Sequence, residues 1–153
     1  MEELQFCRTE LTRQRGILAD LVQHQLSPAL KAEGIPIFDH KDLSASQKDE
    51  LNHYFKDSVQ PILSPLALDI GHPFPFISSL ALNLAITIHR PDLNQPLFIR
   101  LKVPTNRPRW VPVSEAGFVP LEQIMEVHLK QLFPRSRIEC HLFRVIHGAK
   151  DDP

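Results

Sequence analysis

The side chains most able to do chemistry in this sequence form a basic group near the middle of the chain. Residues 93–114 contain no Asp or Glu but include Arg100, Lys102, Arg107 and Arg109. Arg100 and Lys102 alternate with apolar residues, so a strand would place both on one outward face. Four cations without nearby acids create a positive field that attracts a polyanion. The group predicts a polyanion contact, although a solvated sheet face that binds nothing is the more common cause of such a pattern.

The other reactive side chains form no catalytic or metal-binding pattern. The eight histidines include no pair four residues apart, and no Cys-x-x-Cys sequence occurs. His141 and His147 share an expected strand but are six residues apart, roughly 20 Å along an extended chain. The five glycines are too scattered for a phosphate-binding loop, and Cys140 lies mid-strand without an obvious activating base. We expect no catalytic, cofactor-binding or metal-binding residue in this chain.

Composition places the chain among soluble globular proteins. Its 153 residues are 42% apolar and 23% charged, and the net charge of −1 gives no general attraction to nucleic acid. Cys7 and Cys140 are too few and too distant to indicate a disulfide, which is typical of a reducing compartment. No apolar run approaches the roughly 18 residues of a transmembrane segment, and the first residues lack a signal-peptide pattern. We therefore expect a cytoplasmic protein without a membrane span or a nucleic-acid partner.

Residues 1–60 are expected to be a helical section. Pro28 should kink or end the first helix, and Gly34 should close it in a left-handed conformation. A second helix should begin at Ser44, which can form a capping box with Gln47. The first helix has one apolar stripe, which we expect to pack on another chain or on another part of the protein, and hence to support a homo-oligomer. This stripe consists of Leu4, Cys7, Leu11, Leu18, Leu21 and Val22.

Residues 61–153 are expected to form an α+β region, a mostly antiparallel sheet covered by one helix. The proline-rich segment 61–76 predicts an extended connector, and a helix is expected at 121–133. Alternation of apolar and polar residues predicts strands at 80–89, 97–103, 110–113 and 138–146. In the first strand, the core side is expected to be Leu80, Leu82, Leu84, Ile86 and Ile88.

Several segments resemble bacterial polyphosphate kinases of the large, histidine-phosphorylated type. The most specific is His72-Pro-Phe-Pro-Phe-Ile77, which follows Val59-Gln-Pro-Ile-Leu-Ser-Pro-Leu-Ala-Leu-Asp69 and precedes Leu82-Asn-Leu-Ala85. Further similar segments occur in the family's order, so the resemblance covers nearly the whole chain. These segments are Ala29–Ile35, Tyr54-Phe55, Arg100–Pro104, Phe118–Gln123 and Leu142–Val145.

The resemblance implies a phosphotransferase that makes polyphosphate from ATP, with ATP and magnesium required by the full-length family. It also implies that this chain is one internal piece, residues 1–60 ending the N-terminal domain and residues 61–153 beginning the head domain. The family's nucleotide-binding motif and phosphorylated histidine have no counterparts here, so the chain alone should be inactive and need no cofactor. Residues 146–153 depart from the family's continuation, which suggests an incomplete head domain and a truncated, split or partial reading frame.

Three interpretations of the function follow. The first is a polyphosphate kinase fragment that supplies scaffold, dimerisation and substrate-approach surfaces, with polyphosphate as partner and ATP bound through domains outside this chain. The alternative is a free-standing, non-catalytic module that binds a polyanion or a protein. The third is a non-functional remnant, which should fold poorly because the apolar stripe of its first helix has lost its partner.

Overall fold

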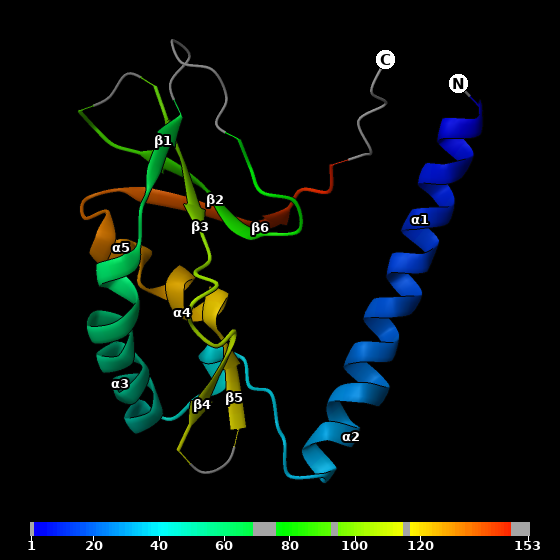
Figure 1. The fold of residues 1–153 in the computed structure, drawn as a ribbon, viewed down its shortest axis with the longest axis horizontal. Helices are drawn as coiled ribbons and strands as arrows, with labels where there is room; N and C mark the ends of the chain where they lie inside the picture. Colours follow the sequence, from blue (N-terminus) through cyan, green and yellow to red (C-terminus); the bar gives the residue numbers. More distant parts are fainter. Residues whose placement is uncertain (1, 69–75, 93–94, 115–116, 148–153) are drawn as a thin grey trace.

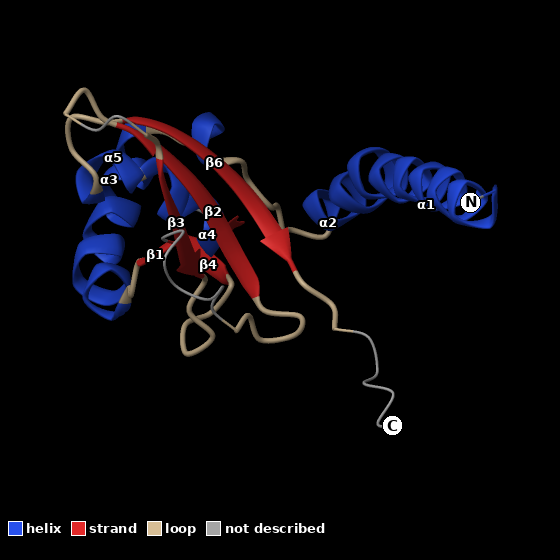
Figure 2. Ribbon diagram, turned by 90° about the horizontal axis from the view of Figure 1, so that it is seen from above, coloured by secondary structure: helices blue, strands red, loops and turns tan. Residues whose placement is uncertain are grey.

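The computed structural model describes residues 2–68, 76–92, 95–114 and 117–147. A curved four-stranded sheet lies beside a group of short helices, and a smaller two-stranded sheet continues from it (Figure 1). The N-terminal helix projects away from this body, as the view from above makes clear (Figure 2). The arrangement confirms the expected α+β class, a helical section followed by a mostly antiparallel sheet with helices against it.

The larger sheet has the strand order β1-β3-β2-β6, with every neighbouring pair antiparallel. Its strands are β1 (Leu66–Leu68), β2 (Leu82–His89), β3 (Leu97–Lys102) and β6 (Arg137–Arg144). Consecutive β2 and β3 pair directly, which confirms the expected hairpin. The short β1 lies at one edge within the proline-rich segment expected to be extended, and residues 69–75 of that segment lie outside the described residues.

Alternation along β2 confirms its core face, because Leu84, Ile86 and Ile88 are almost completely buried. The expectation that Leu80 belongs to that face is wrong. Leu80 is 60% exposed, precedes the strand and has a φ of +64°, a turn conformation that ends the alternation. The last strand is also shorter than expected, because β6 ends at Arg144 and excludes Ile146.

The smaller sheet pairs β4 (Trp110–Val113) with β5 (Gly117–Pro120). The first of these strands was expected, whereas the second was missed because Gly and Pro end its four residues. The strand β4 lies at the edge of this sheet, where its Pro112 is tolerated. The chain near Phe38 extends this sheet, since the Phe38 and Phe118 backbones bond at 2.8 Å and the Phe38 ring occupies the space beside Gly117.

The helix expected at 121–133 is two helices, α4 (Leu121–Val127) and α5 (Leu129–Leu132). His128 interrupts them with φ −91° and ψ 0°. Its ring Nδ1 lies 2.6 Å from the Ile124 carbonyl oxygen, which a regular helix would give to the His128 amide. That amide bonds instead to the carbonyl of Met125, so the turn tightens at this point.

The N-terminal helix runs through α1 (Glu2–Leu21), a π-helical turn η1 (Val22–Leu26) and α2 (Ser27–Ala32). Pro28 lies in the first turn of α2, so the wider π turn precedes the residue that lacks an amide hydrogen. Gly34 has a φ of +75° and closes the helix, as expected. The apolar stripe remains exposed, with Leu4 at 77% and Leu18 at 61%. None of the described helices is both long and apolar enough to cross a membrane.

The next helix, α3 (Ala45–Tyr54), begins with the expected capping box between Ser44 and Gln47. It continues into the π turn η3 (Phe55–Val59) and the 3-10 turn η4 (Gln60–Ile62). One core joins this helix to the larger sheet and to α4. Its fully buried members include Leu51, Phe55, Val59, Leu84, Leu101 and Ile124. The division at residue 60 stays a prediction, and the core is continuous across it.

Candidate functional site

Arg100 and Lys102 lie on the outer face of the larger sheet, which carries no helix of the core. The register places Arg100 opposite Ala85 of β2, and Ala85 opposite His141 of β6. Lys102 lies opposite Asn83 in the next row. Paired residues of an antiparallel sheet project from the same face, so β2, β3 and β6 together form this surface.

The Arg100 side chain is held in place by a buried amide. Its Nε donates to Asn83 Oδ1 at 2.9 Å, while Asn83 Nδ2 donates to the Ala81 carbonyl at 2.8 Å. Asn83 is 0% exposed, so this hydrogen bond is shielded from water. Both terminal nitrogens of Arg100 are without a partner in the described part of the chain. A guanidinium held in this way presents its fork for bidentate binding of phosphate oxygens.

Lys102 is exposed at the end of β3 and adds a second positive charge to this face. No ion pair involves it among residues 2–68, 76–92, 95–114 and 117–147. Together the two side chains can attract an anion, and Arg100 can also orient it.

Arg107 and Arg109 are not part of this surface. Arg107 lies in the connection from β3 to β4, where its Nε donates to the Ser58 carbonyl at 3.1 Å and ties the connection to the end of η3. Arg109 contacts both carboxylate oxygens of Glu122, the shortest distance being 2.6 Å, and lies 5.1 Å from the centre of the Trp110 ring. The expectation of four cations without counter-charges is therefore wrong for Arg109. Glu122 follows 13 residues later, so a search for acids within the basic stretch missed it.

Among the described histidines and cysteines, His141 and His89 lie on this face, and His89 is at its far end, 3.6 Å from Glu139. Among the described residues, no group of three or more His, Cys, Asp or Glu side chains could hold a metal ion. His147 lies beyond β6, and its Nε2 is 2.6 Å from the Ile77 carbonyl oxygen, so it does not share a strand with His141. Burial raises the pKa of the Cys140 thiol to about 11, which leaves it protonated and a poor nucleophile.

Three residues of the outer face, Asn83, Ala85 and His141, were not predicted from the sequence to belong to a polyanion site. The period-two pattern does place Asn83 and Ala85 opposite the core side of β2. What was missing is the register between β2 and β6, because these strands are separated by some fifty residues of chain that include β3, β4, β5 and two helices.

Comparison with known proteins supplies a family for this fold. The family model that describes the polyphosphate kinase middle domain matches residues 46–150. A polyphosphate kinase of Synechocystis is 41% identical over 141 residues, which cover 83% of this chain, and one of Mycobacterium leprae is 40% identical over 139 residues. The crystal structure of the Porphyromonas gingivalis polyphosphate kinase superimposes with a TM-score of 0.83 at 25% identity over 94% of this chain.

These relatives are longer than the present chain. It spans 19% of the Synechocystis and M. leprae proteins and 36% of a polyphosphate kinase from Aphanizomenon baltica. It also spans 24% of the P. gingivalis chain. The sequence matches, the shared fold and the resemblance of the proline-rich segment agree, and the chain belongs to the polyphosphate kinase family through that family's middle domain.

Proposed function

We propose that this chain is the middle-domain part of a polyphosphate kinase, which transfers the γ-phosphoryl group of ATP to polyphosphate. The observation that carries the proposal is the match of residues 46–150 to the family's middle domain. The catalytic groups, ATP and magnesium would be held by parts of the enzyme outside this chain. The chain itself would be inactive in phosphoryl transfer and need no cofactor, and it would act in the cytoplasm.

Within that enzyme the chain would provide a scaffold and a contact for polyphosphate on the outer face of the sheet. Arg100 and Lys102 support this role, because their cationic ends have no counter-ion among the described residues, unlike Arg109. Polyphosphate repeats a negative charge along its length, so a fixed guanidinium and a neighbouring ammonium group suit it. Arg107 and Arg109 would hold the β3–β4 connection in place rather than contact the polymer.

The test is a salt titration of binding to long-chain polyphosphate, measured by calorimetry. We expect wild-type affinity to fall steeply with salt, because bound cations are released from the polymer. The double variant Arg100→Gln/Lys102→Gln should reduce the slope of log K against log salt concentration by about one to two. The charge-matched control Lys31→Gln/Lys130→Gln removes two exposed cations elsewhere and should preserve the slope. Equal slopes for all three proteins would place the contact away from Arg100 and Lys102.

A second function, a free-standing module that binds a partner protein, is favoured by the exposed apolar stripe of α1. The genomic sequence on both sides of the codons for residues 1–153 discriminates between the two. A continuous reading frame that encodes further polyphosphate kinase domains supports the enzyme. Stop codons on both sides, with no neighbouring gene for those domains, would support the module.

A further inference from the structure

One row of paired residues crosses the sheet from β3 through β2 to β6, and we call it the Ala85 row. In this row a small residue lies between two large polar ones. Arg100 flanks Ala85 on β3, and His141 flanks it on β6. Ala85 and His141 are exposed, and Arg100 is half-buried. Neighbouring strands are roughly 4.8 Å apart, so the backbones at Arg100 and His141 are separated by about 10 Å. A methyl group at the centre leaves the space between the two side chains open to a ligand.

The two flanking side chains can both donate hydrogen bonds into this space. The terminal nitrogens of Arg100 are available because its Nε is the atom bonded to Asn83. The imidazole of His141 carries a ring N–H that can donate to a phosphate oxygen. Lys102, in the adjacent row, extends the positive charge along β3.

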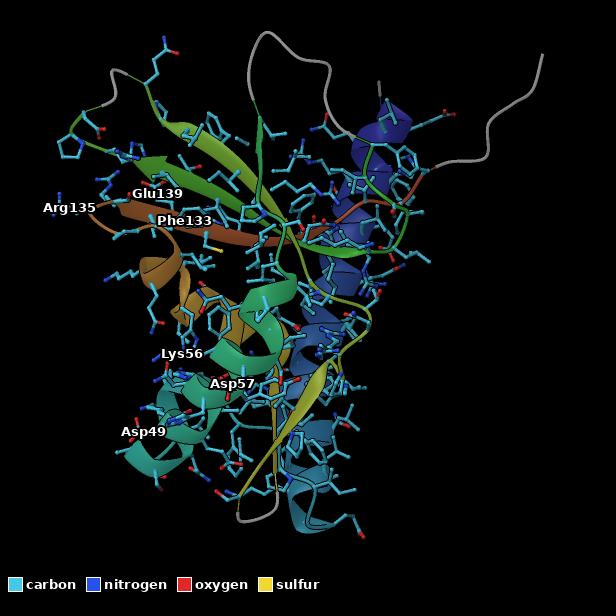
Figure 3. The ribbon with its side chains drawn as sticks, turned by 60° about the vertical axis from the view of Figure 1, so that its left-hand side comes forward. Asp49, Lys56, Asp57, Phe133, Arg135 and Glu139 are labelled. Atoms are coloured by element: carbon cyan, nitrogen blue, oxygen red, sulfur yellow. The ribbon has the colours of Figure 1, made fainter. Side chains whose placement is uncertain are left out.

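Glu139, the acidic residue of this face, is paired with cationic neighbours, so its negative charge repels an approaching anion only weakly. Glu139 lies one row beyond His141, opposite Thr87, at the end of β6 that adjoins Arg135 (Figure 3). Its carboxylate is 2.7 Å from the Arg137 guanidinium and 3.6 Å from His89 Nε2. The uncompensated charge of the outer face is therefore concentrated toward Arg100 and Lys102.

We propose that the Ala85 row binds a chain of linked phosphates that runs across the strands, with Arg100 and His141 as its two contacts. This inference rests on the proposed function and specifies where the polymer lies. The backbones at Arg100 and His141 are about 10 Å apart, so a chain of linked phosphates can present a separate phosphate group to each side chain and bind more tightly than a single phosphate group does. The ligand class is therefore an oligophosphate or polyphosphate rather than orthophosphate.

The experiment measures affinity for long-chain polyphosphate and for orthophosphate at one fixed, low salt concentration. Ala85→Glu places a carboxylate between the two contacts and should weaken polyphosphate binding by at least about tenfold, because like charges repel. The matched control Ala19→Glu makes the same change on exposed α1 and should bind as the wild type does. His141→Ala should weaken binding, and His141→Lys should strengthen it, a gain that misfolding cannot produce.

The outcomes separate this inference from the proposed function. Wild-type affinity in Ala85→Glu and His141→Lys, with a loss in Arg100→Gln/Lys102→Gln, would overturn the position across Ala85 and leave the polyphosphate contact in place. Wild-type affinity in Arg100→Gln/Lys102→Gln as well would overturn both. Orthophosphate bound as tightly as the polymer would overturn the requirement for linked phosphates.

Discussion

Arg100 and Arg109 carry the same guanidinium group but have opposite surroundings. Arg109 forms an ion pair with Glu122, whose side chain is only 8% exposed. The pair neutralises the charge of Arg109 and links the chain next to β4 to the start of α4. Arg100 faces the neutral amide of Asn83 and keeps its full positive charge. A buried partner fixes both side chains, but only a neutral partner leaves the cation able to bind an anion.

His128 provides a test at the same scale, because it is a buried titratable group. Burial lowers its pKa, and the nearby positive charge of Lys56 on η3 (Figure 3) lowers it further, which outweighs the hydrogen bond to Ile124. Burial also lowers the pKa of His40, with smaller contributions from Lys48 and His128. Below pH about 6.5 the unfolded chain therefore binds more protons than the folded chain, and stability falls as pH decreases.

We expect the urea midpoint of the wild type to be lower at pH 5 than at pH 7.5. His128→Leu should reduce this pH dependence, while costing about 1–3 kcal/mol at pH 7.5 because Asn52 and Ile124 lose a hydrogen-bond partner. His53→Leu, which changes an exposed histidine of α3, is the control and should preserve the pH dependence. A midpoint that does not fall with pH in the wild type would contradict the stated effect of burial.

The elements differ in how much of their apolar surface the rest of the chain covers. In α3 and η3, Leu51, Phe55 and Val59 are at most 1% exposed, because these turns pack beneath the sheet. The long α1 projects from the body, and its stripe lies in solvent although it has the spacing of a packing face (Figure 2). Exposed apolar surface of this kind indicates an interaction face.

If the stripe of α1 supports a homo-oligomer, as the sequence predicts, charges placed on the stripe should disrupt association. Leu11→Lys/Leu18→Lys should shift a dimer toward monomer in sedimentation velocity, raising the dissociation constant by at least about tenfold, equivalent to about 1.4 kcal/mol. Gln5→Lys/Thr9→Lys adds the same charge to the opposite side of the helix and should leave association unchanged. A wild-type chain that is monomeric at tens of micromolar, roughly the range of a weak interface, would remove the basis for this proposal.

At the scale of the whole molecule, the reactive groups of the described residues are dispersed or buried rather than gathered in one site. Among the described residues no metal-binding cluster forms, and burial keeps the Cys140 thiol protonated. The ring of His128 lies in the core, where its Nδ1 contacts the Ile124 carbonyl oxygen. The chain's 17 basic and 18 acidic residues nearly cancel, so local arrangement rather than net charge determines where an anion can bind.

This distribution of groups leads us to expect no phosphoryl transfer by the chain alone. Incubation with labelled ATP, magnesium and polyphosphate should leave no acid-labile label on the protein and none in the polymer, since phosphoryl transfer needs positioned metal ions and a nucleophile. Denatured chain gives the background for this measurement. Label that is retained by the folded chain and lost when one histidine is replaced would contradict the expectation.

The sequence by itself determined the local elements wherever one short-range signal dominated. Ser44 and Gln47 marked the start of α3, Gly34 marked the end of α2, and alternation located β2 and β3. Local signals failed at β5 and at His128. A four-residue strand containing Gly and Pro has no clear pattern, and the break between α4 and α5 depends on where one side-chain nitrogen binds.

The partners of the charged residues were decided by the tertiary structure alone. Arg109 pairs with Glu122, Arg107 donates to the Ser58 carbonyl, and Arg100 donates to Asn83. Each contact joins residues that are 13 or more positions apart, so it forms only when the chain folds. The sequence supplied four cations and the alternation that turned two of them outward. The register between distant strands placed His141 across Ala85 from Arg100, since the pairing of β2 with β6 turns Leu84, Ile86 and Ile88 of β2 and the half-buried Ile138 and Cys140 of β6 toward the same core.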